Sequence, residues 1–139
     1  MNIYFSCSIT GGRDDQAIYR RIVDFILEKG HVVPTAHLAS LDAMKNESST
    51  DAVEIFHRDM NWVKNCDVLV AEVSTPSHGV GYEIAEAINL GKRVLCCYQE
   101  GKKVSKIITG NTSKGVTVFS YANEADLLCT IGEFLSTSA

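Results

Sequence analysis

The sequence of 139 residues has no hydrophobic run approaching a membrane span and no excess of basic residues. A transmembrane helix needs about 20 consecutive apolar residues, so we expect no membrane-embedded segment. The formal net charge is −4, from 13 Lys and Arg against 17 Asp and Glu. A broad surface for nucleic acid or anionic membrane needs clustered Lys and Arg. The composition therefore argues against both partners, although a pocket for one small anion needs only a few donors.

Paired metal-binding or disulfide spacings are also missing. The five Cys form no CxxC pair, and the four His show no HxxxH spacing. We therefore predict no metal site, and we interpret the Cys as small buried side chains in a reducing compartment. The N-terminus starts with strand-like residues 3–5 rather than a signal-peptide pattern. These features predict a cytoplasmic protein, or a nuclear one in a eukaryote.

Short apolar runs alternate with helical patterns along the chain. The runs at 2–7, 31–34, 67–73, 92–98 and 116–119 predict strands, and the patterns at 16–29, 51–65, 80–90, 104–108 and 122–135 predict helices. Strands joined by helices imply a parallel sheet covered on both faces. We therefore predict an α/β, flavodoxin-like (Rossmann-like) fold with five parallel strands, in a single domain over residues 1–139. Residues 36–50 show no firm period and are predicted to be an irregular loop, a candidate lid or substrate loop.

Glu83 is the first candidate catalytic residue. It follows the turn after the strand at 67–73, in the predicted first turn of a helix, on a face shared with Ala87 and Leu90. Open α/β sheets bind ligands at the carboxyl ends of strands. A carboxylate on an apolar stripe is costly unless it is hydrogen-bonded or functional. The helix dipole would favour its ionised form, which suits a nucleophile. The alternative is that Glu83 only complements the helix N-terminus.

Asp59 is the natural second carboxylate. On the helix at 51–65 one apolar seam is predicted to pack on the sheet, and the adjacent seam contains Asp59, which should therefore face a half-buried surface. The two seams are Val53, Phe56, Met60, Val63 and Ile55, Asp59, Trp62, Cys66. Paired carboxylates are the usual machinery of glycoside cleavage. The alternative is a structural ion pair of Asp59 with Arg58, Lys64 or a neighbouring loop.

Tyr4 and a set of turn residues are further candidates. On an alternating strand Tyr4 points away from Ile3 and Phe5, so its hydroxyl needs a polar partner if it is buried; simple sheet packing is the alternative. Glycines and hydroxyls after two strands form turns whose backbone N–H groups can cradle phosphate, although plain turn chemistry would also explain them. These residues are Ser8, Thr10, Gly11, Gly12, Ser77, Gly79 and Gly81.

The segment Gly79-Val80-Gly81 also begins like a dinucleotide-binding GxGxxG motif. Its third glycine position holds Ile84, and the turn before it is long for that motif. NAD is therefore a weak candidate, and we expect no cofactor.

Several motifs together resemble the 2′-deoxynucleoside 5′-monophosphate N-glycosidases of the nucleoside 2-deoxyribosyltransferase superfamily. The similarity runs from about residue 3 to residue 110, and Pro-Ser-x-Gly-Val-Gly-Tyr-Glu at 76–83 is its most specific part. The other matching segments are 4–13, Asp59-Met60-Asn61-Trp62, Asp67-Val68, Ala71-Glu72-Val73 and Leu90-Gly91-Lys92.

The resemblance implies a homodimer that cleaves the N-glycosidic bond of a deoxynucleotide through a covalent glycosyl-enzyme intermediate. It implies that Glu83 is the nucleophile, that Tyr4 orients it, and that Asp59 assists the leaving base. It further implies that Ser105 reaches a phosphate from the partner subunit. The residues expected to bind substrate or its phosphate are Ser8, Ile9, Thr10, Gly11, Arg13, Ser77, Gly79 and Ser105.

The sequence departs from the family pattern at three positions near these residues. Thr10 stands where a family member has arginine, Cys7 replaces a glycine, and His78 replaces an apolar residue. The function predicted is hydrolysis of (2′-deoxy)nucleoside 5′-monophosphates to free base and sugar 5-phosphate. The alternatives are base exchange by a nucleoside 2-deoxyribosyltransferase, a CMP-type ribonucleotide N-glycosidase, and a nucleotide-binding sensor without catalysis.

Overall fold

Four parallel strands form one sheet in the order of the chain. The computed structural model describes residues 1–9, 15–40 and 42–137. The strands are β1 (Ile3–Ser6), β2 (Val68–Glu72), β3 (Arg93–Gln99) and β4 (Val116–Tyr121). Each neighbouring pair is parallel, with Tyr4 opposite Leu69 at the centre of the first pair. The prediction of a parallel α/β sheet is confirmed.

The fifth predicted strand, at 31–34, is reduced to an isolated bridge between Val32 and Asn2. Pro34 has no N–H and cannot continue the ladder. The hydroxyl of Thr35 takes over the next position, because it accepts from Phe5 N at 3.1 Å and donates to Phe5 O at 2.7 Å. The prediction of five strands is therefore corrected to four strands and a bridge, which preserves the flavodoxin-like order.

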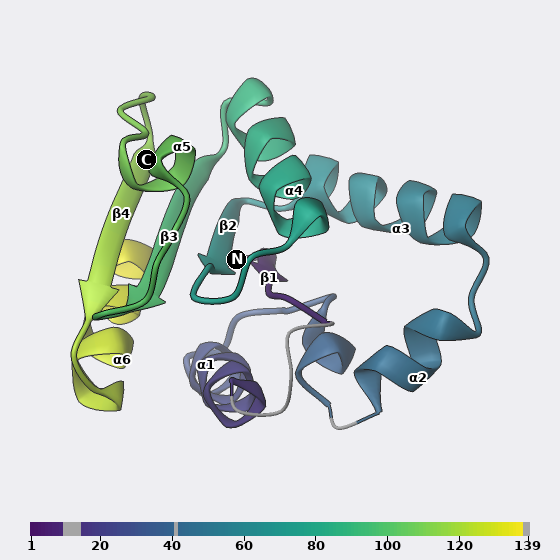
Figure 1. Ribbon diagram of the computed structural model, residues 1–139, viewed down its shortest axis with the longest axis horizontal. Helices are drawn as coiled ribbons and strands as arrows, with labels where there is room; N and C mark the ends of the chain where they lie inside the picture. Colours follow the sequence, from purple (N-terminus) through teal and green to yellow (C-terminus); the bar gives the residue numbers. More distant parts are fainter. Residues whose placement is uncertain (10–14, 41, 138–139) are drawn as a thin grey trace.

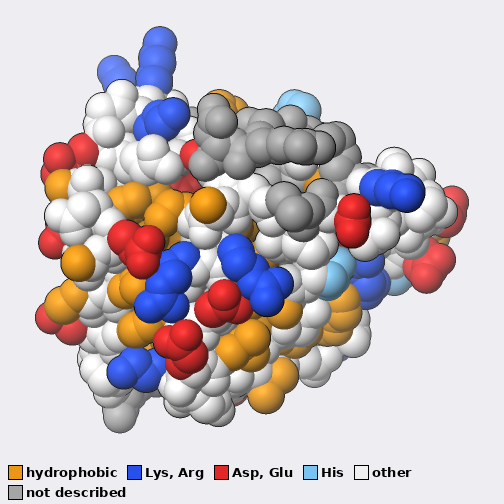
Figure 2. Space-filling model, turned by 90° about the horizontal axis from the view of Figure 1, so that it is seen from below, with side chains coloured by type: hydrophobic (Ala, Val, Ile, Leu, Met, Phe, Trp, Pro, Cys, Tyr) orange, Lys and Arg blue, Asp and Glu red, His pale blue; other side chains and the backbone are white. Residues whose placement is uncertain are grey.

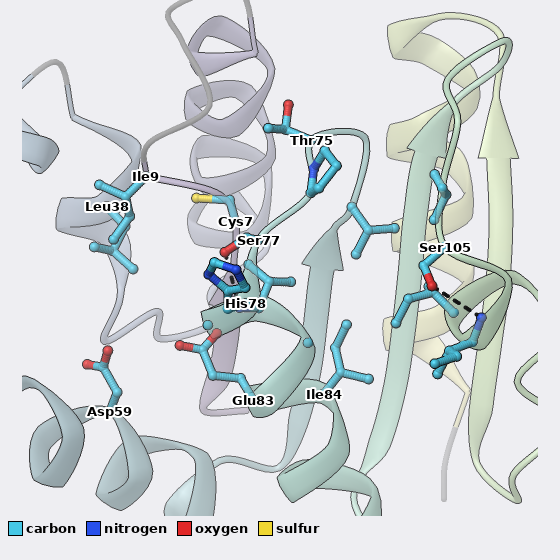
Figure 3. A pocket seen from close by; sticks show the side chains of 18 of the residues that line it. Cys7, Ile9, Leu38, Asp59, Thr75, Ser77, His78, Glu83, Ile84 and Ser105 are labelled. Carbon is cyan, nitrogen blue, oxygen red and sulfur yellow. Dashed lines mark hydrogen bonds between the residues drawn. The ribbon is translucent and has the colours of Figure 1, made fainter.

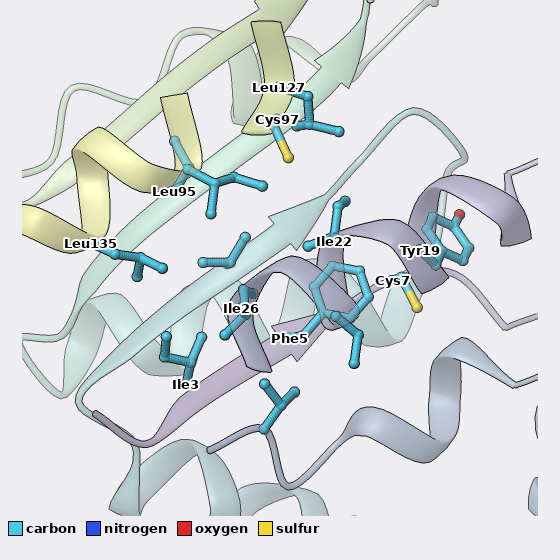
Figure 4. Packing of buried hydrophobic residues seen from close by; sticks show 14 of the residues in the cluster. Ile3, Phe5, Cys7, Tyr19, Ile22, Ile26, Leu95, Cys97, Leu127 and Leu135 are labelled. Atoms are coloured by element: carbon cyan, nitrogen blue, oxygen red, sulfur yellow. The ribbon is translucent and has the colours of Figure 1, made fainter. Parts of the chain in front are cut away.

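Helices cover both faces of the sheet, as predicted (Figure 1). On one face α1 (Gln16–Glu28) and α6 (Glu124–Ser136) pack on Ile3, Phe5 and Leu95 (Figure 4). On the other face α3 (Ala52–Asn65) and α4 (His78–Asn89) pack on Tyr4 and its neighbours. Successive side chains of a strand point to opposite faces, so β1 directs Tyr4 toward α3 and α4.

The segment 36–50 is not an irregular loop. It contains the 3-10 helix η1 (Ala36–Ala39) and the short helix α2 (Ala43–Ser48), joined through Leu41, which lies outside the described residues. Elements of four and six residues are too short to reveal a period in the sequence. The short helix predicted at 104–108 is α5 (Lys106–Thr109), which begins two residues later.

Both predicted seams of α3 contribute to the core, since Val63 of one seam and Cys66 of the other are buried. In the seam predicted to pack on the sheet, Val53 and Phe56 are 62% and 48% exposed, so that prediction is confirmed for its second half and wrong for its first half. The reason is that the N-terminal part of α3 extends past the sheet toward α2 (Figure 1). Asp51 caps the helix, since its Oδ2 accepts from Val53 N at 3.0 Å.

The mixture of charges on the surface agrees with a composition that has no excess of basic residues. On the face shown in Figure 2 acidic and basic side chains lie next to one another. On α1, Arg20 and Arg21 form ion pairs. Within the described ranges no helix has both the length and the apolar character to cross a membrane. Four Cys are buried as predicted, whereas Cys129 is exposed on α6.

Candidate active site

A cavity of about 870 Å³ lies at the carboxyl ends of the strands. Its walls come from the segments after β1, β2 and β3 and from α3, and Figure 3 shows the side chains that line it. It therefore occupies the place where open α/β sheets bind ligands. Among the residues predicted for the site, the lining includes Ile9, Asp59, Ser77, Gly79, Glu83 and Ser105.

Glu83 is held by two hydroxyl groups from β1. Tyr4 donates to Oε1 at 2.8 Å, and Ser6 donates to Oε2 at 2.5 Å. Tyr4 itself is fully buried, so its pairing with Glu83 confirms that its hydroxyl has a polar partner. Ser6 was missed by sequence reasoning. The signal was available, because residues two apart on a strand face the same way and Ser6 follows Tyr4 by two.

The position of Glu83 on its helix differs from the prediction. The helix α4 begins at His78, capped by Ser77, so Glu83 is the sixth residue and lies beyond the first turn. The helix dipole acts mainly within that turn, and the argument that it keeps Glu83 ionised is corrected. Gly79 and Gly81 likewise lie inside α4 rather than in the turn before it.

Burial raises the pKa of Glu83 to about 7. The hydrogen bonds from Ser6 and Tyr4 and the charge of Arg58 act in the opposite direction, while the negative charge of Asp59 raises the pKa further. The pKa of Tyr4 is raised far above its ordinary value by burial and by Glu83. Tyr4 therefore stays protonated and acts as a donor. At neutral pH a substantial fraction of Glu83 is ionised and oriented by two donors.

Asp59 is buried and lines the same cavity as Glu83. Arg58 Nε donates to Asp59 Oδ1 at 2.8 Å, and Arg58 Nη2 donates to Glu47 at 2.9 Å and 3.2 Å. The ion pair with Arg58 that the sequence offered as an alternative is therefore present together with access to the cavity. Sequence reasoning missed Glu47, because nothing in a segment without a clear period indicates that α2 folds back on α3.

A second, smaller hollow of about 380 Å³ borders the same two carboxylates. Asp59 and Glu83 line both hollows, so they stand between them. The smaller one is aromatic at its rim, where Phe56 and Tyr82 meet edge to face with ring centroids 6.3 Å apart. The two carboxylates are thus open to a ligand from two sides.

The residues predicted to bind phosphate are arranged around the large cavity in different ways. Ser77 caps α4 by accepting from Val80 N at 3.3 Å, and Ser105 caps α5 by accepting from Ile107 N at 3.3 Å. Ser8 is buried, and its hydroxyl finds no partner among the described residues. Thr10, Gly11 and Arg13 lie outside the described residues.

Two basic or ionisable side chains add to this lining. His78 follows Ser77 at the start of α4, and Lys103 precedes α5. Lys103 was not predicted, although the Gly-Lys-Lys turn at 101–103 marks a cation after a strand. Within the described ranges no three His, Cys, Asp or Glu side chains come together as a metal site would require.

Comparison with known proteins identifies a matching family and several similar sequences. The family model for nucleoside 2-deoxyribosyltransferase matches residues 3–128. A 5-hydroxymethyl-dUMP N-hydrolase of Mus musculus is 41% identical over 128 residues, covering 88% of this chain and 73% of its own. The protein of the same name from Danio rerio is 43% identical over 118 residues, covering 82% and 81%.

A solved structure has the same fold. The CMP N-glycosidase BcmB of Clostridium botulinum superposes with a TM-score of 0.69, covering 94% of this chain and 97% of its own, at 20% identity. At that identity the likeness concerns the fold.

Proposed function

Since the chain belongs to the nucleoside 2-deoxyribosyltransferase family, we propose that it hydrolyses the N-glycosidic bond of 2′-deoxynucleoside 5′-monophosphates. The products are the free base and deoxyribose 5-phosphate. One observation carries the proposal: Glu83 borders a cavity at the carboxyl end of the sheet, both its oxygens are held by hydroxyl donors, and Asp59 stands beside it. Relatives at about 40% identity named as hydrolases of a deoxynucleotide support it.

In the first step a carboxylate oxygen of Glu83 forms a bond to C1′ of the sugar. The bond between C1′ and the base nitrogen breaks, and its electron pair leaves with the base through an oxocarbenium-like transition state. Tyr4 and Ser6 fix the direction of the attacking carboxylate. Asp59 borders the same cavity, and we assign it the contact with the leaving base or the sugar.

In the second step water attacks C1′, the bond between C1′ and Glu83 breaks, and its electron pair returns to the carboxylate. The proton that this water loses balances the proton that the base takes up as it leaves. Two displacements at one carbon return the original configuration. The carboxylate must be ionised to attack, and burial with a pKa of about 7 leaves a large ionised fraction at neutral pH.

The 5′-phosphate is assigned to the polar rim formed by Ser77 and Ser105, with Ser8, whose buried hydroxyl has no partner among the described residues, as a third candidate. Ser77 and Ser105 line the cavity, and each precedes a helix whose first N–H groups have no partner within the helix backbone. Lys103 adds a cation at the same rim. These residues favour a phosphorylated substrate over a free nucleoside.

A panel of nucleoside and deoxynucleoside 5′-monophosphates, analysed for free base by chromatography, tests the activity. We expect base release from at least one deoxynucleotide and little from the matching unphosphorylated nucleoside. The absence of free base with every nucleotide would contradict the proposal. A slowly reacting 2′-fluorinated nucleotide should leave a sugar-phosphate adduct, and mass spectrometry should locate it on the peptide that contains Glu83.

Base exchange is the second candidate, because the same glycosyl intermediate can be attacked by a base instead of water. The family to which the chain belongs is named for that reaction. Adding a different free base to the assay separates the two outcomes. A hydrolase gives deoxyribose 5-phosphate and the original base, whereas a transferase gives a nucleotide that carries the added base.

The same panel separates deoxyribonucleotides from ribonucleotides such as CMP. Hydrolysis of CMP without hydrolysis of any deoxynucleotide would favour the ribonucleotide alternative.

We further propose that the protein is a homodimer. Large apolar side chains are exposed on three elements near the site: Phe56 on α3 and Tyr82 on α4, which line the smaller hollow, and Ile107 on α5. Ile107 is 82% exposed and also borders the cavity, so a second copy seated there would bury it and close the open side of the site. Exposed apolar pairs such as Phe56 and Tyr82, whose rings are in contact, are typical of protein interfaces. Sedimentation should give twice the chain mass, and Ile107→Glu should shift it toward the monomer.

Mixing two inactive variants tests whether Ser105 acts across that interface. In a Glu83→Gln and Ser105→Ala mixture, a hybrid dimer regains one intact site if Ser105 serves the partner. Random exchange should then restore about a quarter of wild-type activity, because half the dimers are hybrids with one working site. No recovery would place Ser105 in the site of its own chain.

A further inference from the structure

The ion pair between Arg58 and Asp59 is not an automatic product of helix geometry. Neighbouring residues on a helix do not face each other, so Arg58 must bend toward Asp59 for its Nε to lie 2.8 Å from Oδ1. Two contacts hold it in that shape. Glu47 of α2 accepts from Nη2 at 2.9 Å and 3.2 Å, and the guanidinium lies 5.0 Å from the centre of the Trp62 ring.

These groups are shielded from water to different degrees. The side chains of Arg58, Asp59 and Glu47 are 24%, 12% and 11% exposed. Exposed ion pairs contribute little, but shielded charges interact more strongly and are costly to leave unpaired. Glu47 is also 3.3 Å from Nε2 of His37 on η1, and that ring lies against Trp62 with centroids 5.8 Å apart. The cluster therefore joins η1 and α2 to the part of α3 that carries Asp59.

Arg58 lines neither hollow, whereas Asp59 lines both. Arg58 must therefore act on a substrate through Asp59. We propose that Arg58, clamped by Glu47, is a positioning residue that fixes the carboxylate of Asp59 beside Glu83. Because the guanidinium binds Oδ1, the other oxygen of Asp59 is left for the base or the sugar. This inference rests on the proposed function, which supplies the reaction that Asp59 assists.

The same pair acts on the charge of Glu83. Arg58 and Asp59 stand side by side on α3 and influence the pKa of Glu83 in opposite directions, the cation lowering it and the anion raising it. Among the described residues, the other ionisable groups around Glu83 or its cavity are Tyr4 on β1, Cys7 after it, His78 on its own helix and Lys103 before α5. Removing Arg58 should therefore raise the pKa of Glu83, and removing the charge of Asp59 should lower it.

The experiment compares Arg58→Gln, Arg58→Lys and Glu47→Gln with the wild-type protein in base release from its best nucleotide. Arg58→Gln should lower kcat about tenfold to a hundredfold, because misplacing a catalytic group by about 1 Å costs that much. KM should change less than kcat. Arg58→Lys should recover part of the loss, since it keeps the charge without the two-sided contact. Glu47→Gln should lower kcat less than Arg58→Gln, because Trp62 and Asp59 still hold the guanidinium.

Two controls separate positioning from general damage. Arg20→Gln removes an arginine from an exposed ion pair on α1 and should leave kcat unchanged. Carbon-13 NMR of the Glu83 carboxyl follows its titration without turnover, and it should move to higher pH in Arg58→Gln and to lower pH in Asp59→Asn. Circular dichroism at each pH confirms that the variants are folded.

Unchanged kcat in Arg58→Gln would overturn the inference, and so would a fall in kcat without any shift in the titration of Glu83. If the wild-type protein released no base from any nucleotide, the proposed function would fail instead, and the NMR titration would still report whether Arg58 acts on Glu83.

Discussion

Two glutamates in this fold are each held by one tyrosine and one serine, yet only one of them borders a cavity. Glu83 accepts from Tyr4 at 2.8 Å and from Ser6. Glu72, at the end of β2, accepts from Tyr121 at 3.1 Å and from the hydroxyl of Ser74. Burial raises the pKa of both carboxyls.

The difference lies in what else each carboxylate can reach. Glu72 has no exposed surface, and its partners join β2 to β4 and to the turn that follows β2. Glu83 borders two hollows together with a second carboxylate, Asp59. A buried, hydrogen-bonded carboxyl with a raised pKa is therefore not sufficient to indicate catalysis. Access to a cavity and a partner acid distinguish the two sites.

Replacing each glutamate by glutamine is the strongest test of this comparison. Glu83→Gln should lower kcat by roughly 10³-fold or more, because the nucleophile is lost while the shape is kept. Glu72→Gln should keep most of the activity, since Glu72 touches no ligand space. Base release by chromatography measures both, and Glu86→Gln on the same helix is the matched control. Wild-type turnover in Glu83→Gln would remove the distinction.

The fall of activity at acidic pH should reflect the protonation of Glu83 and not that of Glu72. The carboxyl of Glu83 must be ionised to attack, and its pKa is about 7. Activity should therefore rise with pH through neutrality, and at two pH units below this pKa it should be about a hundredth of its plateau. Glu72→Gln should leave that acidic limb in place, whereas Asp59→Asn should move it to lower pH. A limb displaced by Glu72→Gln would show that the two sites are coupled.

The two tyrosines should separate the sites through their hydroxyl groups. Tyr4→Phe removes a donor that lowers the pKa of Glu83, so kcat should fall about tenfold and the acidic limb should move to higher pH. Tyr121→Phe should leave kcat unchanged and lower the free energy of unfolding by about 1 kcal/mol, from one lost buried hydrogen bond. Kinetics and urea denaturation of both variants measure this. Equal losses of activity would contradict the assignment.

The smallest effect concerns stability. The pKa of Glu83 is about 7 in the folded chain and near its ordinary 4.5 in the unfolded chain. The folded state therefore binds more protons between these values, and its stability from this group falls as pH rises through that window, by on the order of 1–3 kcal/mol. Glu83→Gln should remove this dependence, so the variant should be more stable than wild type at pH 8 but not at pH 4. Urea unfolding at both pH values tests it.

The sequence predicts the sheet and the inward carboxylates because both depend on local periodicity. Tyr4 opposite to Phe5, and Asp59 on a buried seam, follow from the periods of strand and helix. The apolar pattern predicts that α4 begins at residue 80, whereas the helix begins at His78, capped by Ser77. Because of these two residues Glu83 lies in the second turn, where the helix dipole has little effect on its charge.

Contacts between segments distant in sequence could not be predicted from the sequence. Glu47 meets Arg58 only because α2 folds against α3, and Thr35 replaces a strand only because its hydroxyl lies at Phe5. Neither Glu47 nor Thr35 belongs to a periodic hydrophobic pattern that would predict these contacts. Ser6 was within reach, since it follows Tyr4 by two residues on the same strand.

The Thr35 hydroxyl also protects the edge of the sheet against pairing with a strand of another molecule. β1 is the outer strand of the ladder and carries both Tyr4 and Ser6, so a foreign strand pairing with it would distort the site as well as start a fibre. Thr35 occupies the donor and the acceptor of Phe5 at once, and Val32 occupies the position before it. One side chain thus satisfies both backbone groups of Phe5 at the edge where a full fifth strand would otherwise pair.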